Sequence, residues 1–265
     1  MKDPWNGYIE PVRIWGGLYF VGTMPASTHI IDTGEGLIMI DSGYQESLYI
    51  VIHNMYKIGL NPMDIKYIVH THGHIDHLGA TRALTELTGA KTFIGAEDRD
   101  YANGKLDLTW AKELGLEYNG PFEPDVLIKD GSQIKLGNTV IDCVATPGHS
   151  PGAMSFFFDV TENGRKYRVG LPGGMGINSM QKEFLDRYGL SYDCRDKFVM
   201  AMDRLMDIKV DIFLGNHAHH NNTKEKAEMV RGGNQEAFVN PDEWGLHIIE
   251  SKQALIDMVK NEKNS

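Results

Sequence analysis

The sequence predicts a mixed α/β protein, because strand-like apolar runs and helical repeats occur together in both halves. In the first half, an apolar run at 67–69 precedes a histidine-rich loop and a helix-like stretch at 80–87. In the second half, strand-like alternation begins at 126, and a helical repeat near 198–206 precedes another apolar run at 210–214. The length of 265 residues is ample for a full hydrophobic core.

The first half begins with short strands separated by glycine, expected at 17–21, 27–32 and 37–40, which indicates an antiparallel meander. A helix is expected over 45–60, where apolar residues recur every three or four positions, and Gly59 and Pro62 end it. The run at 67–69 is short enough for a buried strand. We expect one or two polar helices over 95–116, and Pro121 and Pro124 then separate the halves.

The second half is expected to contain more strands than the first. They are predicted at 126–128, 133–136, 139–145, 154–160, 166–170 and 210–214. Phe198, Met202, Leu205 and Met206 follow the helical period. Helices at 222–230 and 241–260 are expected to make the C-terminal segment, about 222–263, helical.

Composition excludes several classes of protein. With 26 Lys+Arg against 36 Asp+Glu, the net charge is −10, and no basic cluster is present to bind nucleic acid. No run approaches the roughly 20 apolar residues of a membrane helix, and the first residues lack a signal-peptide core. We therefore expect a cytoplasmic protein, or an exported one whose signal was removed. Two cysteines, Cys143 and Cys194, form no disulfide framework, although one bridge remains open.

Imidazoles and carboxylates crowd into one stretch after the run at 67–69, which reads HTHGHIDH from His70 to His77. Such groups are costly to bury unless a cation or solvent compensates them, and a divalent metal does so most simply. His72 and His74 are two apart and point the same way, whereas Asp76 and His77 begin the next helix. One stretch can therefore supply two ions. Nitrogen and oxygen donors without thiolate suit zinc, and iron or manganese remains open.

Further candidate ligands also follow predicted strands. His149 follows the strand at 139–145, His217 follows the run at 210–214, and Asp41 ends the strand at 37–40. Ligands in α/β sheets collect at the carboxyl ends of strands. His219 and His220 compete with His217, but the spacing after the strand favours His217. We interpret His29, His53 and His247 as surface or hydrogen-bonded residues.

These motifs resemble those of the metallo-β-lactamase superfamily. The residues His72, His74, Asp76 and His77 match its signature H-x-H-x-D-H. The segment TPGHSPG at 146–152 resembles T-P-G-H-[ST]-x-G, and LIMIDSG at 37–43 resembles a strand ending in D-[ST]-G. The resemblance runs from about 17 to 217. It implies a four-layer αβ/βα sandwich, with two mixed sheets face to face and helices outside, as one domain over 1–265 with two similar halves.

The resemblance also implies the site. One zinc ion would be held by His72, His74 and His149, and a second by Asp76, His77 and His217. A metal-bound hydroxide would attack the substrate, and Asp76 would orient groups or shuttle a proton. Asp41 would orient a ligand imidazole, or else serve only as a turn former at the strand end.

One departure from the family is informative. In the thioesterase and lactonase branches a Gly-Asp step supplies an Asp that bridges both metals, but the corresponding segment 167–176 here, YRVGLPGGMG, has no Asp. The cysteine-ligand subclass is disfavoured because no Cys lies there. The oxygen-reducing diiron branch has Glu where His74 stands. What remains resembles the β-lactamase subclass whose second zinc is bound by Asp and two His.

The expected function is hydrolysis of an acyl bond in a small molecule, first of all a β-lactam-like cyclic amide. The alternatives are an ester, lactone or thioester hydrolase acting on a metabolite, and a metal-stabilised binding protein without turnover. Gly148, Ser150 and Gly152 also match the pattern G-x-S-x-G. That mechanism needs an N–H after the serine, which Pro151 lacks. The glycines at 173–176 are expected to form a tight loop near the metals. The oligomeric state stays open.

Overall fold

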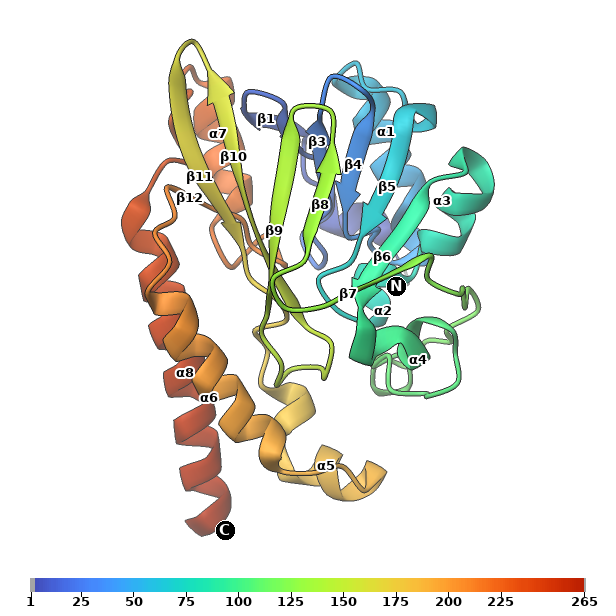
Figure 1. The fold of residues 1–265 in the computed structure, drawn as a ribbon, viewed down its shortest axis with the longest axis vertical. Helices are drawn as coiled ribbons and strands as arrows, with labels where there is room; N and C mark the ends of the chain where they lie inside the picture. Colours follow the sequence, from blue (N-terminus) through green and yellow to red (C-terminus); the bar gives the residue numbers. More distant parts are fainter. Residues whose placement is uncertain (1–2, 265) are drawn as a thin grey trace.

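Two mixed β-sheets lie face to face, with helices on their outer faces, in the computed structural model, which describes residues 3–264 (Figure 1). Met1, Lys2 and Ser265, which the predicted domain includes, lie outside these residues. The predicted four-layer αβ/βα sandwich is confirmed.

The first sheet has seven strands in sequence order. They are β1 (Val12–Trp15), β2 (Leu18–Phe20), β3 (His29–Asp32), β4 (Leu37–Ile40), β5 (Ile65–Val69), β6 (Lys91–Gly95) and β7 (Val126–Ile128). Strands β1 to β4 form the predicted antiparallel meander, and β4 to β7 run parallel. The carboxyl ends of β4, β5 and β6 therefore share one edge of the sheet.

The second sheet has five strands, in the order β12 (Ile212–Phe213), β11 (Arg165–Leu171), β10 (Met154–Glu162), β9 (Thr139–Ala145) and β8 (Gln133–Leu136). All neighbours are antiparallel except β11 and β12. Strands β9, β11 and β12 consequently point the same way. The loops after them meet at one edge, as the loops after β4 to β6 do in the first sheet.

Alternation along the strands divides the core into layers. Ile38 and Ile40 of β4 face the core between the sheets, whereas Leu37 and Met39 pack under α1 (Leu48–Lys57) and α3 (Thr81–Thr88). In the second sheet, Phe157 of β10 packs outward against α6 (Asp193–Met206) and α8 (Pro241–Asn264). Both sheets are thus covered on both faces.

The remaining helices are short. They are α2 (Ile75–Leu78), α4 (Arg99–Ala102), α5 (Lys182–Tyr188) and α7 (Thr223–Arg231). Among them, α7 packs against β1 and the core between the sheets. In the described part of the chain, no helix is long and apolar enough to cross a membrane.

The prediction of polar helices over 95–116 is largely wrong. This segment contains only the single turn α4 and two 3-10 turns, Ala96–Asp98 and Lys112–Leu114, joined by irregular chain. Gly104 and Gly115 adopt left-handed φ angles of +75° and +66°, which end the turns before a helix can propagate. The result is a loop that lies beside the histidine cluster.

Candidate metal centre

The histidine-rich stretch follows β5 directly and leads into one turn of helix, α2. His74 occupies the position before that turn with an extended backbone, so Asp76 and His77 lie inside it as predicted. His72, His74 and His77 are at most 3 % exposed. The sequence therefore delivers several metal-ligating side chains to one buried place at the edge of the first sheet.

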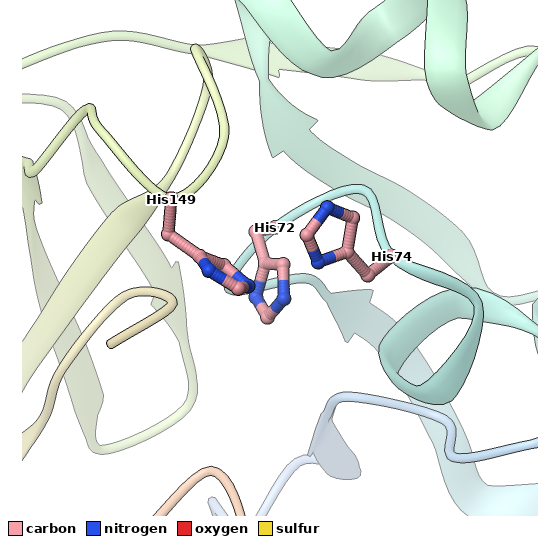
Figure 2. A group of neighbouring side chains, drawn as sticks. All are labelled: His72, His74 and His149. Carbon is pink, nitrogen blue, oxygen red and sulfur yellow. The ribbon is translucent and has the colours of Figure 1, made fainter. Parts of the chain in front are cut away.

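The loop after β9 brings His149 to the same place from the second sheet. Its ring centroid lies 4.7 Å from that of His72 and 4.4 Å from that of His74. One ligand nitrogen from each of the three lies within 4.8 Å of the others. Figure 2 shows the three rings turned toward one another from their two loops. This arrangement suits one cation held by three imidazoles.

A second group lies beside the first and shares His72 with it. His72, Asp76 and His77 also place one ligand atom each within 4.8 Å of the others. His217, from the loop after β12, approaches this group with its Nε2 3.8 Å from Oδ2 of Asp76. His72 lies between the groups, its ring 4.2 Å from that of His77. The structure thus brings all six predicted ligands together.

Hydrogen bonds orient the rings of His149 and His217 so that Nδ1 is used and Nε2 is left for a ligand. Nδ1 of His149 donates to the Gly176 carbonyl (2.6 Å), and Nδ1 of His217 donates to the Pro25 carbonyl (2.5 Å). Because a carbonyl only accepts, both rings keep their proton on Nδ1. A neutral ring with a protonated Nδ1 presents the lone pair of Nε2, which is the form that binds a metal.

Buried Nε2 atoms that lack a hydrogen-bond partner indicate whether these residues could hold a metal ion. Nε2 of His72 and Nε2 of His77 are buried and make no hydrogen bond, although Nε2 of His77 lies 3.1 Å from Oδ2 of Asp76. His70, in the same stretch, instead uses both nitrogens, with Phe93 (2.9 Å) and Thr81 (2.7 Å). His70 is therefore a structural residue, whereas a cation would satisfy the unpaired donor set of nitrogen and oxygen atoms.

The electrostatics of the cluster favour neutral imidazoles in the first group. Burial, and then the neighbouring imidazoles, lowers the pKa of His72 and of His74 well below 6.5. Burial likewise lowers the pKa of His149 to about 4. These side chains are neutral at pH 7 and hence ready to coordinate.

His77 differs because carboxylates flank it. Burial alone would lower its pKa, but Asp76 and Asp41 raise it to about 10. For Asp76, burial would raise the pKa, and the charge of His77 lowers it below its usual range. Asp76 is therefore a carboxylate at neutral pH and can act as a ligand or accept a proton.

Asp41, at the end of β4, contacts His77. Its Oδ2 accepts from His77 Nδ1 (2.8 Å) and from the Thr71 hydroxyl (2.7 Å), and its Oδ1 accepts from the Thr71 backbone N–H (2.8 Å). Asp41 has a left-handed φ of 57°, uncommon for a residue with a side chain. The carboxylate thus connects the ends of β4 and β5 and directs the ring of His77.

Asp98 is a residue that the sequence analysis missed. It is fully buried in the 3-10 turn after β6 and accepts from Gly73 N–H (2.8 Å), Ser150 Oγ–H (2.6 Å) and Gly152 N–H (2.6 Å). Burial raises the pKa of Asp98 to about 6 against the opposing effect of these hydrogen bonds. Gly73 separates His72 from His74, and Ser150 follows His149. Asp98 therefore ties together the two loops that carry the first group.

The glycine-rich loop after β11 lies against His149, as predicted. A Cβ on Gly174 would stand 1.9 Å from Cδ2 of His149, so only glycine fits there. Leu171, at the end of β11, is buried between the sheets and offers no metal ligand. The segment 167–176 thus packs against one imidazole and supplies a carbonyl to it, without a carboxylate.

His219 and His220 do not replace His217. His219 is exposed, and the ring of His220 lies between those of His217 (4.9 Å) and His247 (4.8 Å). Nδ1 of His220 and Nε2 of His247 are buried without a hydrogen-bond partner. Of the three candidates, His217 approaches Asp76, with its Nε2 3.8 Å from Oδ2 of that residue.

A sandwich of two mixed sheets with a buried His/Asp cluster at its edge is a fold that carries a candidate metal site. The sequence matches the metallo-beta-lactamase superfamily over residues 21–162, more than half of the chain. The chain therefore belongs to that superfamily and is a metallo-β-lactamase-like hydrolase.

Two curated relatives align with about half of the chain. A "Probable metallo-hydrolase YflN" of Bacillus subtilis is 28% identical over 156 residues, 54% of this chain and 56% of its own length. An "N-acyl homoserine lactonase" of Bacillus thuringiensis is 25% identical over 166 residues, 53% of this chain and 61% of its own length. The chain thus spans less than two thirds of the length of both.

Solved structures match nearly the whole chain. The metallo-β-lactamase FEZ-1 of Legionella gormanii is 25% identical, covers 98% of both chains and has a TM-score of 0.89. GOB-18 of Elizabethkingia meningoseptica is 28% identical with a TM-score of 0.83, covering 98% of this chain and 96% of its own. BJP-1 of Bradyrhizobium japonicum, a subclass B3 metallo-β-lactamase, is 23% identical, covers 99% of this chain and 98% of its own, and has a TM-score of 0.88, which supports the fold alone.

Proposed function

We propose that the protein is a dinuclear zinc hydrolase that opens a cyclic amide of the β-lactam kind. The observation that carries this proposal is the end of β11, where Leu171 is buried in the core and the segment 167–176 contributes no carboxylate to the cluster. The similarity to FEZ-1 and GOB-18 across almost the whole chain supports it, since these proteins are described as metallo-β-lactamases.

In this proposal the six residues act as two sets of ligands. His72, His74 and His149 hold one zinc ion, and Asp76, His77 and His217 hold the other. Bound zinc would lower the pKa of coordinated water toward about 7 and polarise the scissile carbonyl.

The chain's own groups prepare this chemistry. The hydrogen bond from His77 Nδ1 to Asp41 turns Nε2 toward Asp76, where a bound metal would take the place of the Nε2 proton. Pro25 and Gly176 fix His217 and His149 in the same way. Asp76 remains ionised beside His77 and His217, where it can orient a ligand or take up a proton.

Because the segment 167–176 supplies no bridging aspartate, the second set contains one carboxylate, that of Asp76, among the residues that the structure describes. That set would therefore retain open coordination positions. An amide nitrogen leaves less readily than a thiolate and benefits more from metal stabilisation. This argument favours amides over thioesters as substrates.

The second candidate is an ester, lactone or thioester hydrolase acting on a metabolite. The observation that favours it is the relative described as an N-acyl homoserine lactonase, which is 25% identical over 166 residues. Its alignment covers 53% of this chain, whereas the likeness to FEZ-1 covers 98%. We therefore rank it second.

The test is a comparison of kcat/KM for the zinc-loaded enzyme on a chromogenic cephalosporin, an acyl homoserine lactone and a glutathione thioester. We expect lactam opening to exceed thioester hydrolysis. Lactone or thioester hydrolysis about tenfold faster, with lactams untouched, would move the function to the second candidate. Zinc-loaded protein that turns over none of them would favour a binding protein.

The compartment follows from the substrate in this proposal. A lactam-opening enzyme protects a cell where the drug acts, outside the cytoplasm, whereas a hydrolase of a metabolite is expected inside it. Fractionation of the native host with an antibody against this protein separates the two.

A further inference from the structure

A cavity of about 600 Å³ opens directly beside His74 and His149. Apolar or aromatic side chains form much of its wall, namely Tyr101, Leu108, Phe184, Leu185, Leu190 and Cys194. A volume in this range is typical of sites that enclose a small organic molecule. The cavity is therefore large enough for a substantial part of a substrate and continuous with the first histidine group.

Segments inserted between β11 and β12 build much of this wall. Helices α5 and α6 project beyond the ends of the strands (Figure 1). Although α5 is only seven residues long, its Phe184 and Leu185 are 7 % and 1 % exposed. Trp110 packs between His74 and Phe184, with ring centroids 6.0 Å and 4.7 Å away. The apolar wall is thus anchored to the histidine cluster by aromatic contacts.

The charged residues around the cavity largely balance one another. Lys197 pairs with Asp193 (2.7 Å), and Asp130 pairs with Arg204 (2.8 Å). The other two, Glu97 and Lys129, are exposed and opposite in sign. The balanced charges do not favour an ionic ligand. The apolar wall instead favours a ligand whose apolar surface is buried in the cavity by the hydrophobic effect.

We propose that this cavity binds an apolar acyl group of the substrate, so that the enzyme prefers acyl compounds with a medium-length hydrocarbon chain or an aryl group. The scissile carbonyl would lie next to His74 and His149, and the chain would extend toward α5 and α6. The inference rests on the proposed hydrolase function only where it identifies the bound acyl group as part of a substrate. Binding to the cavity itself needs no turnover.

Cys194 provides a direct reporter of occupancy, because it lines the cavity and is half-buried, whereas Cys143 is 1 % exposed. The experiment uses metal-free protein and measures alkylation of Cys194 by iodoacetamide, by mass spectrometry, with octanamide or acetamide present. We expect saturating octanamide to slow alkylation roughly fivefold or more, since only unoccupied protein reacts. Acetamide, which has the same amide head, should not protect.

Two variants locate the binding, and one exposed position serves as the matched control. Leu190→Trp adds bulk to the cavity and Leu190→Asp adds charge, and both leave the histidines unchanged. Met200→Trp places the same ring at a position of α6 that is 72% exposed. By calorimetry, octanamide should bind wild type and Met200→Trp equally and both Leu190 variants at least about tenfold more weakly. Circular dichroism checks that each variant is folded.

With the zinc-loaded enzyme, kcat/KM should rise about 100-fold from acetyl to octanoyl esters or amides in wild type, and much less in Leu190→Trp. Octanamide binding without hydrolysis of any acyl compound would support the cavity and refute the proposed function. The inference would be overturned if octanamide did not slow the alkylation of Cys194 and bound Met200→Trp and both Leu190 variants with equal affinity. This holds whatever the enzyme hydrolyses.

Discussion

The carboxylate of Asp98 accepts a hydrogen bond of 2.6 Å from the backbone N–H of Gly152, and so links β6 of the first sheet to the loop before β10 of the second. The fit is close, because a Cβ on Gly152 would lie 2.5 Å from the backbone nitrogen of Asp98. Through Gly73, the same carboxylate also reaches the loop of His72 and His74. One buried side chain therefore fixes the relative position of ligands that come from two sheets.

Asp98→Asn should weaken metal binding by about 10- to 100-fold at the first group, because an amide NH2 replaces an oxygen that accepts hydrogen bonds. Titration against a chromogenic chelator measures this affinity. Asp100→Asn, two residues along on a partly exposed turn, is the control and should bind as wild type. Equal affinities for both variants would show that Asp98 does not position the ligands.

Asp41→Ala should disturb the second group more than the first. It leaves His77 Nδ1–H and both Thr71 donors without an acceptor and places alanine at a left-handed φ, which we expect to cost roughly 2–4 kcal/mol of stability. Denaturant unfolding of the metal-free protein measures this loss. Asp32→Ala, at the exposed end of β3, should change stability by less than about 0.5 kcal/mol. A similar loss in both variants would argue that Asp41 is only a strand-end residue.

His217→Ala should remove about one metal ion per chain, chiefly from the second group, and leave His72, His74 and His149 able to bind. His219→Ala is the matched control, since His219 lies two residues away and is exposed. Metal content per chain after gel filtration distinguishes them. If His219→Ala loses the ion and His217→Ala keeps it, our choice among these histidines is wrong.

Most of the fold could be predicted because its strands are compact apolar runs and its long helices have a clear period. Strands β1 and β6 and helix α5 were missed. Helix α5 is short, and its buried Phe184 packs against Trp110, which is distant in the sequence. Such burial leaves little local period to detect. The interpretation as one domain with two similar halves, which the family resemblance implied, stays a prediction.

The predicted ligands were accessible to sequence reasoning because their residue types are dense or follow recognisable strands. Asp98, like Asp41, is a carboxylate that follows a parallel strand. Because the sequence analysis did not predict β6, it did not consider the residues after that strand as candidates. The sharing of His72 between two groups also depends on ring distances that no spacing encodes. These relationships exist only once the two sheets are packed together.

The most direct test of the account is the zinc content of protein expressed with ample zinc and freed of loosely bound metal, measured by elemental analysis. The account predicts close to two zinc ions per chain, loss of both on prolonged chelation and loss of hydrolysis with them. One ion or none per chain in folded, zinc-supplied protein would contradict the dinuclear centre.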